Sequence, residues 1–312
     1  MATSVTSDFQ VYDALSQSAY LERREDVIQV FNAASNGAIV LENQAIQGDF
    51  NKRAFYTVGG SMQHRDVNST ATVTAEKIGS EEMVDVKIPW KYGPYQSTEE
   101  AFKRRARSPE EFADVVGRDM ADATLDGFLQ HGYGGLLAAV GANTDMVVPA
   151  DFDIDGKKVL TKGLRTLGDR FGRLALWVMN SATYFDLVDN AIDEKLFEEA
   201  GLVVYGGQPG TMGKPVLVTD TMAVDKILGL QPGAIRITES QAPGVRNYPV
   251  NDQENLGLGF RGEGAFNLAL LGYSWDGDAN PNLAALETAA NWRKHFQSNK
   301  STAGFIIDLS GE

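Results

Sequence analysis

The 312-residue chain contains no cysteine and only three histidines. The lack of cysteine excludes disulfides, thiolate metal sites and a cysteine nucleophile. His64, His131 and His295 lie in three separate segments, at no metal-binding spacing such as HExxH, and no GxSxG nucleophile elbow accompanies them. A hydrolase that uses two carboxylates stays open because 42 acidic residues offer candidates, although no pair stands out. We expect no catalytic residue.

Basic residues and long apolar runs are also scarce. The 28 lysines and arginines face 42 acidic residues, which gives a formal net charge of -14. Tight nucleic-acid binding needs cationic side chains that displace counterions from phosphates. Because this chain is acidic, it could enclose nucleic acid without binding it tightly. No apolar run approaches the roughly 18 residues of a membrane span, and the first thirty residues carry no signal-peptide pattern. The sequence therefore predicts neither membrane insertion nor secretion.

Two motifs resemble ligand sites but lack a required residue. Residues 207–215 come close to a phosphate-binding loop, yet Pro215 stands where the motif needs Ser or Thr to ligate magnesium. We interpret this segment as a glycine-rich loop between two strands. Asp151, Asp153 and Asp155 resemble the start of a calcium loop, but Lys162 stands where the closing glutamate belongs. A solvated turn explains them better, and we expect no metal and no cofactor.

The stretch from Arg107 to Val140 predicts a long helix around which the rest is organised. Ser108 and Pro109 form a helix start, because Ser caps well and Pro has no amide hydrogen to lose at the first position. Apolar residues then recur at helical spacing. We expect Gly132, Gly134 and Gly135 to end or bend the helix, which leaves roughly 22 regular residues and about 33 Å of rod.

A basic cluster precedes this helix and is the strongest local positive charge in the chain. Most charge runs are solvated faces, which is the first interpretation. The second is contact with acidic neighbours on other subunits, and the third is contact with nucleic acid. The cluster consists of Lys103, Arg104, Arg105 and Arg107.

The first 98 residues predict two segments that cannot fold alone. Residues 1–45 contain a short helical pattern closed by Asn36 and Gly37, with too few apolar residues for independent stability, so they pack on their own body or on another subunit. Residues 46–98 predict a long hairpin, with Thr70–Thr74 as one strand and Val84–Trp90 as the other. A two-stranded ribbon is marginal in water, so its apolar strip needs a covering surface from its own core or from a partner. The strip consists of Val84, Val86, Ile88 and Trp90.

The rest of the chain predicts a mixed domain at 140–255, followed by a tail at 256–312 that returns to the long helix. Helical patterns lie at 158–171 and 181–192 in this domain and at 283–289 in the tail. Strand patterns lie at 174–179, 202–205, 216–219, 234–238, 256–260, 265–273, 292–297 and 305–309.

Several of these segments, taken in order, resemble tailed-bacteriophage major capsid proteins with the HK97 fold. The resemblance rests on residues 166–169 and 176–184, a strand leading into a helix, and on the strand 213–220. Asn180 stands where that family commonly has His. Asn280-Pro281-Asn282 and Asn291-Trp292 also look like the end of such coat proteins.

The resemblance implies an α+β, HK97-like capsid fold. It implies an N-terminal arm at 1–45, an extended β-hairpin loop at 46–98, a peripheral domain with the spine helix at 99–139 and 256–312, and an inserted axial domain at 140–255. It also implies a structural, non-enzymatic subunit that assembles into pentamers and hexamers of an icosahedral head. The alternatives are an encapsulin-type compartment shell and a soluble hydrolase.

The same resemblance implies partners and a location. The subunit would bind copies of itself, enclose double-stranded phage DNA without sequence preference, and work with separate scaffold, portal or decoration proteins. It would be made in the host cytoplasm and end in the virion, with no membrane partner. Bottom-up reasoning agrees, because an arm and a ribbon that cannot fold alone are what a shell subunit lends to its neighbours. The apolar strip and the basic cluster are the candidate contacts between subunits.

Overall fold

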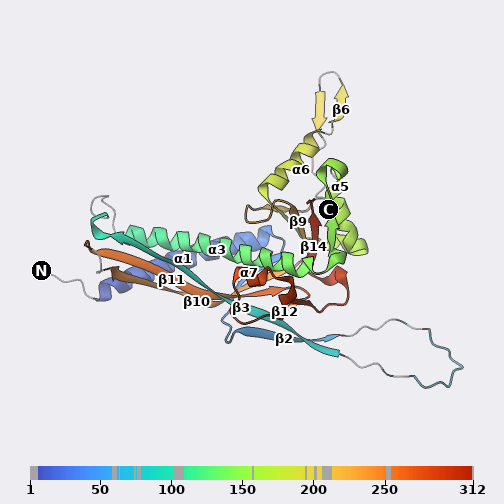
Figure 1. Cartoon of the computed structure of the whole chain (residues 1–312), viewed down its shortest axis with the longest axis horizontal. Helices are drawn as coiled ribbons and strands as arrows, with labels where there is room; N and C mark the ends of the chain where they lie inside the picture. The colour runs from blue at the N-terminus through green and yellow to red at the C-terminus, as the bar shows by residue number, and fades with distance from the viewer. Residues whose placement is uncertain are drawn as a thin grey trace.

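The chain forms an elongated body with a compact domain at one end, and a β-ribbon runs beneath that domain (Figure 1). The computed structural model describes residues 6–57, 62, 64–73, 75, 79–101, 109–156, 158–193, 195–199, 202–205, 213–250 and 254–310. The described chain begins at Thr6 at the far end of the body and ends at Ser310 in the compact domain (Figure 1).

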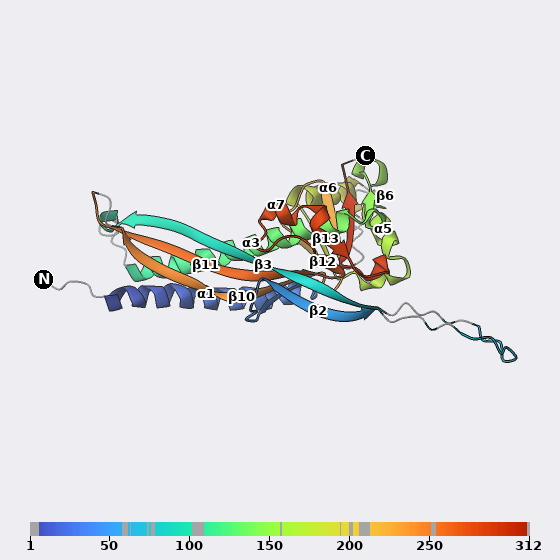
Figure 2. The same ribbon diagram turned by 60° about the horizontal axis from the view of Figure 1, so that its bottom comes forward.

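A long sheet forms the body. The parallel pair β1–β10 is followed by antiparallel pairs β10–β11, β11–β12 and β12–β13, and β3 also pairs with β11. Because these paired strands are long, the sheet is elongated rather than compact (Figure 2). The strands are β1 (Ile39–Asn43), β3 (Gly79–Thr98), β10 (Ile235–Val250), β11 (Gly257–Leu270), β12 (Tyr273–Trp275) and β13 (Trp292–Lys294).

Helix α3 (Pro109–Gly141) lies across one face of this sheet and has 33 residues, about 50 Å of rod. The predicted start at Pro109 is confirmed, but the predicted end at the glycines is wrong. The helix runs on because the glycines allow close packing. A Cβ on Gly132 would lie 3.2 Å from Ile235, and one on Gly135 would lie 3.0 Å from the Trp292 ring.

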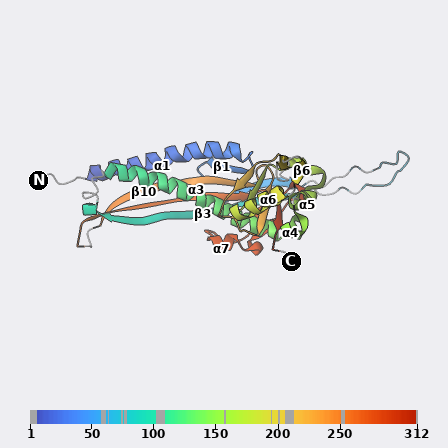
Figure 3. The same cartoon turned by 90° about the horizontal axis from the view of Figure 1, so that it is seen from above.

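Helix α1 (Thr6–Ala34) runs alongside α3 of the same chain (Figure 3). The two helices approach closely at Gly117, where a Cβ would lie 2.5 Å from the Ser16 carbonyl oxygen. Asn36 and Gly37 end the segment with positive φ angles of 50° and 67°, as the sequence predicted. Of the two open alternatives for the N-terminal arm, the structure therefore shows the helix packed on its own body.

The hairpin has one predicted strand and one that sequence reasoning misplaced. The second strand is β3, but its partner is β2 (Phe50–Thr57), and the described residues from Thr70 to Val73 are not a strand. Of the two covering surfaces left open for the apolar strip, the chain's own core or a partner, the structure shows the first for Val86 and Ile88. These side chains are 0% and 2% exposed because the chain's own core covers them.

The compact domain holds a five-stranded sheet in the order β4-β14-β9-β5-β8. The sheets divide the chain differently from the predicted boundaries, because β10 lies in the long sheet and β14, from the tail, lies in the compact one. The strands are β4 (Val147–Pro149), β5 (Leu176–Met179), β8 (Val216–Val218), β9 (Lys226–Leu230) and β14 (Gly304–Asp308), with a separate pair, β6 (Lys195–Glu199) and β7 (Leu202–Tyr205).

The remaining helices are short and lie around the two sheets. Helices α5, η2, α6 and α7 follow the predicted patterns, and the helix predicted at Ser181 begins there. They are η1 (Thr144–Met146), α4 (Phe152–Asp155), α5 (Lys158–Leu164), η2 (Arg165–Arg173), α6 (Ser181–Asp193), α7 (Leu283–Leu286), η3 (Ala289–Asn291) and η4 (Asn299–Ser301). No helix among the described residues has both the length and the apolar character that a membrane crossing requires.

Candidate subunit-interaction surfaces

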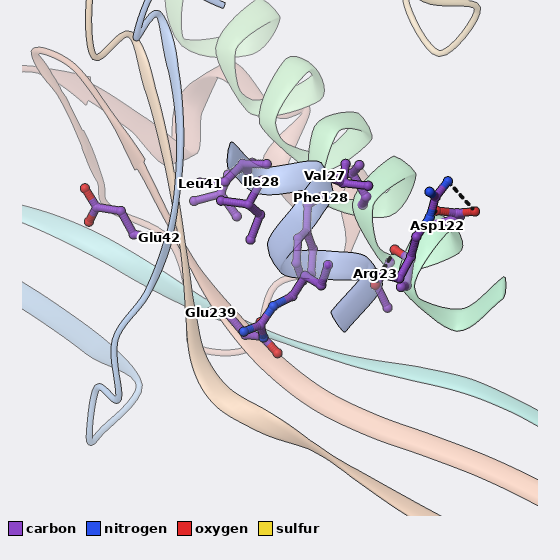
Figure 4. A pocket seen from close by; sticks show the side chains of 13 residues that line it. Arg23, Val27, Ile28, Leu41, Glu42, Asp122, Phe128 and Glu239 are labelled. Atoms are coloured by element: carbon purple, nitrogen blue, oxygen red, sulfur yellow. Dashed lines mark hydrogen bonds and ion pairs between the residues drawn. The ribbon is translucent and has the colours of Figure 1, made fainter. Parts of the chain in front are cut away.

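A buried ionic cluster fastens α1 to the long sheet, beside a small cavity between α1, α3 and β10 (Figure 4). Arg24 of α1 pairs with Glu239 of β10, and both side chains are almost fully buried. The Tyr20 hydroxyl donates to the Glu239 Oε1 atom at 3.4 Å. Thr124 of α3 donates to the Tyr20 hydroxyl at 3.5 Å. The Glu239 carboxylate thus links β10 of the sheet to α1 and, through the Tyr20 hydroxyl, to the spine helix α3.

Burial controls the electrostatics of this cluster. Desolvation raises the pKa of Glu239 above its usual value, and the Arg24 charge opposes that rise. Desolvation, with the Glu239 charge, raises the pKa of Tyr20 to about 12, so the phenol keeps its proton and remains a donor. A second pair, Arg23 with Asp122 at 3.0 Å, lies on the exposed side of the helices (Figure 4). The buried pair makes α1 a fixed part of the subunit, whereas exposed pairs contribute little.

The base of the β2–β3 ribbon is also tied to the body. The His295 ring contacts the Glu81 carboxylate, and the Val84 amide donates to the Ser274 hydroxyl at 2.9 Å. Arg53 of β2 pairs with the buried Asp85 of β3 at 2.9 Å. Burial raises the pKa of Asp85, against the opposing charge of Arg53. The ribbon is therefore anchored where it leaves the sheet, and its direction is set by the body.

Beyond this base the chain carries apolar side chains that its own body does not cover. The exposed fractions are 102% for Met62, 74% for Val67 and 89% for Val73. An Asx turn shapes the segment around Val67, because the Asn68 amide donates to the Asp66 carboxylate at 2.9 Å. Single exposed apolar residues are ordinary, but three on one segment make it a candidate interaction surface.

Trp90, one of the four residues of the predicted strip, lines an open groove. Trp90 is partly buried, and its ring meets the Phe128 ring edge-on with centroids 6.5 Å apart. The groove runs between α3 and β3 and has a volume of about 220 Å³. Val84 is also partly buried, at the base of the ribbon. Trp90 thus keeps the accessibility that a contact between subunits needs.

The compact domain exposes a separate apolar surface. Phe185 of α6 is 62% exposed, and Val224, in the loop that α6 contacts, is 56% exposed. Thr183 of α6 donates to the Val224 carbonyl oxygen, which holds this loop against the helix. The surface lies away from the ribbon, as Figure 1 shows for α6, so it offers a second direction for contact with another subunit.

The ligand-like motifs give no binding site among the described residues. Asp151 caps α4, and Asp155 pairs with Lys162, the residue that replaces the closing calcium ligand. The hydrogen bond from Lys162 lowers the pKa of Asp155, so the lysine takes the place of a cation. No group of three potential metal ligands occurs in the described part of the chain. The basic cluster of Lys103, Arg104, Arg105 and Arg107, and residues 207–212 of the glycine-rich loop, lie outside the described residues.

The geometry therefore shows an elongated sheet, a β2–β3 ribbon and, in the described part of the chain, no enclosed catalytic cluster. Comparison with known protein families identifies the family to which a chain with this arrangement belongs. Residues 8–306 match the Gp13-like family, described as "Major capsid protein 13-like". The chain belongs to this major capsid protein family. No curated protein matches the capsid protein.

Solved structures show the same fold at low sequence identity. The capsid protein resembles a chain from Mycobacterium phage Cain with a TM-score of 0.55 and 10% identity, over 89% of this chain and 90% of that one. A chain from Microbacterium phage Oxtober96 gives 0.54 and 10%, over 89% and 91%. One from Mycobacterium phage Adephagia gives 0.53 and 10%, over 89% and 90%. The fold is the expected HK97-like capsid fold.

The capsid protein is a structural shell subunit that associates with copies of itself in the virion. Sequence reasoning predicted the spine helix, but it missed the buried pair of Arg24 and Glu239 and the exposed side chain of Met62. Arg24 and Glu239 are 215 positions apart, so no local pattern connects them. Met62 could have been found as one of the few apolar residues in the segment between Thr57 and Gly79.

Proposed function

We propose that the capsid protein forms the pentamers and hexamers of an icosahedral head that encloses double-stranded phage DNA. The observation that carries the proposal is the extended loop between β2 and β3, whose residues Met62, Val67 and Val73 are exposed, in a chain whose family match spans residues 8–306. A monomer gains nothing from holding such a segment in water, whereas a neighbouring subunit buries it. Ring closure follows when the same heterologous contact repeats around a symmetry axis.

The compact domain supplies the contacts around the axes in this proposal. It exposes Phe185 and Val224 and lies at one end of the long sheet, with α6 pointing away from the β2–β3 ribbon (Figure 1). In this proposal the chain keeps the arm, extended loop, peripheral domain and axial domain expected from the sequence. Strand β10 is assigned to the peripheral domain and strand β14 to the axial domain. The basic cluster at 103–107 contacts acidic neighbours on other subunits in this proposal.

Charge supports the proposed cargo. A subunit with a formal net charge of -14 repels the phosphates of packaged DNA, so the wall holds DNA without binding it tightly. The family match favours this head over the two alternatives, an encapsulin-type shell with protein cargo and a soluble hydrolase. In the proposal the subunit has no enzymatic activity, is made in the host cytoplasm and works with separate scaffold, portal or decoration proteins.

A loop replacement tests the proposal. Thr57 of β2 faces Gly79 of β3 across the ladder, so an Asn-Gly turn can replace residues 58–78 and close the hairpin. Negative-stain electron microscopy of particles assembled with the other head proteins should show closed, DNA-filled shells for the unmodified chain. The shortened chain should remain a folded, soluble subunit by circular dichroism but form no shells. Normal shells from the shortened chain, or no particles from the unmodified one, would contradict the proposal.

A further inference from the structure

The long sheet has two different faces where β3, β11 and β10 run side by side. Helices α1 and α3 cover one face, because Val245 of β10 packs in a buried cluster with Met120 of α3. A Cβ on Gly262 of β11 would lie 2.5 Å from the Met120 sulfur, so Gly262 points to the same side. Successive residues of a strand point to opposite faces. Arg246 and Arg261, the next residue after Val245 and the one before Gly262, therefore lie on the face away from the helices.

The two arginines are cross-strand neighbours on this face. Arg246 and Arg261 are directly opposite each other in the antiparallel β10–β11 ladder, and both are exposed. Exposed Lys91 of β3 is opposite Glu263 of β11, and Arg261 donates to the Glu263 carboxylate at 3.3 Å. Like charges directly opposite each other destabilise a sheet. The group thus has three cations and one carboxylate, and an anion bound between the arginines would relieve their repulsion.

An aromatic side chain lies beside the arginines in a fixed position. The Tyr248 ring lies over Gly259, because a Cβ on that glycine would come within 2.3 Å of the ring. The Tyr248 hydroxyl accepts a hydrogen bond from the Gln96 side chain at 3.2 Å. Tyrosine and arginine are both enriched in protein–protein interfaces. Tyr248 therefore gives a protein partner an apolar surface to bury next to the charged contacts.

The helices on the other side of the sheet carry mainly the opposite charge. In a closed wall one subunit thick, subunits meet at their edges and ends, so the two sides of the sheet become the inner and outer surfaces of the wall. Arginines that faced the packaged DNA would bind its phosphates, whereas acidic residues repel them. The helical side therefore faces the DNA and the arginines face outward. Exposed acidic residues of α1 and α3 include Glu22, Glu25, Asp26, Asp122 and Asp126.

We propose that Lys91, Arg246 and Arg261 form a docking site for a separate protein that binds the outside of the head through an acidic segment. The planar guanidinium forks of two adjacent arginines bind carboxylates in a bidentate manner, which suits the aspartate and glutamate side chains of such a segment. Tyr248 supplies the apolar contact beside them. The proposal rests on the proposed shell function and adds the position and the chemistry of an exterior partner site.

Binding of an acidic probe to the unassembled subunit tests the site. The probe is a fluorescent protein that carries an oligo-glutamate tail, and the same protein without the tail corrects for background. Arg246→Gln with Arg261→Gln should weaken binding of the probe at least about ten-fold, because two charge-assisted contacts are lost. Arg23→Gln with Arg118→Gln is the matched control, since it makes the same change of charge at exposed positions on α1 and α3 and should bind like the natural chain. Equal binding by the two double variants, each checked for folding by circular dichroism, would overturn the proposal.

Co-sedimentation of the same probe with closed shells of the natural chain tests the direction of the site. The probe is too large to pass through a closed wall, so shells should bind it about as tightly, per subunit, as the unassembled chain does. Binding by the unassembled subunit but not by shells would mean that the arginines face inward or lie against a neighbouring subunit. That result would overturn the docking proposal and leave the shell function intact. Failure of the natural chain to form shells would overturn the proposed function and, with it, the exterior position of the site.

Discussion

Removal of the Glu239 carboxylate should release α1 from the sheet at a large energetic cost. Glu239→Ala leaves the Arg24 guanidinium, 7% exposed, buried without its partner, and it removes the acceptor of the Tyr20 hydroxyl. Breaking a buried ion pair from one side costs about 3–5 kcal/mol, and a lost hydrogen bond adds about 1 kcal/mol. This is a large part of a typical unfolding free energy of roughly 5–15 kcal/mol.

Urea denaturation of the unassembled subunit measures this cost, and hydrogen exchange of α1 amides shows whether the helix is released. Glu263→Ala is the control, because Glu263 lies on the same sheet with a side chain 65% exposed, and it should change stability by less than about 0.5 kcal/mol. The double variant Arg24→Met with Glu239→Leu removes both charges and should be neutral or more stable than the natural chain. A loss below about 1 kcal/mol for Glu239→Ala would refute the view that this pair fastens α1.

Two further perturbations test other contacts. Gly135→Leu should destabilise the subunit by about 1–3 kcal/mol in urea unfolding, because a Cβ there already lies 3.0 Å from Trp292, whereas Gly141→Leu should not. At Asp308, partial burial raises the pKa, but Lys226, at 2.7 Å, and Ser310 outweigh it, so the pKa lies below its usual value. A lowered carboxyl pKa gives stability that is present above about pH 4 and is lost as the pH falls through the folded-state pKa. Asp308→Asn should therefore cost about 0.5–1 kcal/mol at pH 7 and progressively less below about pH 4, and a difference that stays constant with pH would contradict this assignment.

Local chemistry made the spine helix and most strands predictable. Pro109 defines a helix start wherever the chain goes next, and the buried strand at Leu176–Met179 is a continuous apolar run. The end of the helix was not predictable, because glycine signals both a helix stop and a close contact. Only the folded structure shows that Gly135 packs closely against the Trp292 ring and does not form a turn.

Sequence reasoning misplaced the first strand of the hairpin, and it could not decide what covers the apolar strip of the second strand. The two failures have related causes. Phe50–Thr57 carries Lys52 and Arg53 and lacks the alternation that reveals a half-buried strand, whereas Thr70–Thr74 has β-branched residues and the described part of it forms no strand. Alternation in β3 correctly indicated an apolar face, but it does not say what covers that face. The chain's own core covers Val86 and Ile88, whereas Trp90 lines a groove.

Cryo-electron microscopy of assembled particles is the most direct measurement of how the subunit builds a shell. The account predicts closed rings in which density for each extended loop crosses to an adjacent subunit, with α1 still packed along α3 of its own chain. Shells in which every loop contacts only its own subunit would contradict it.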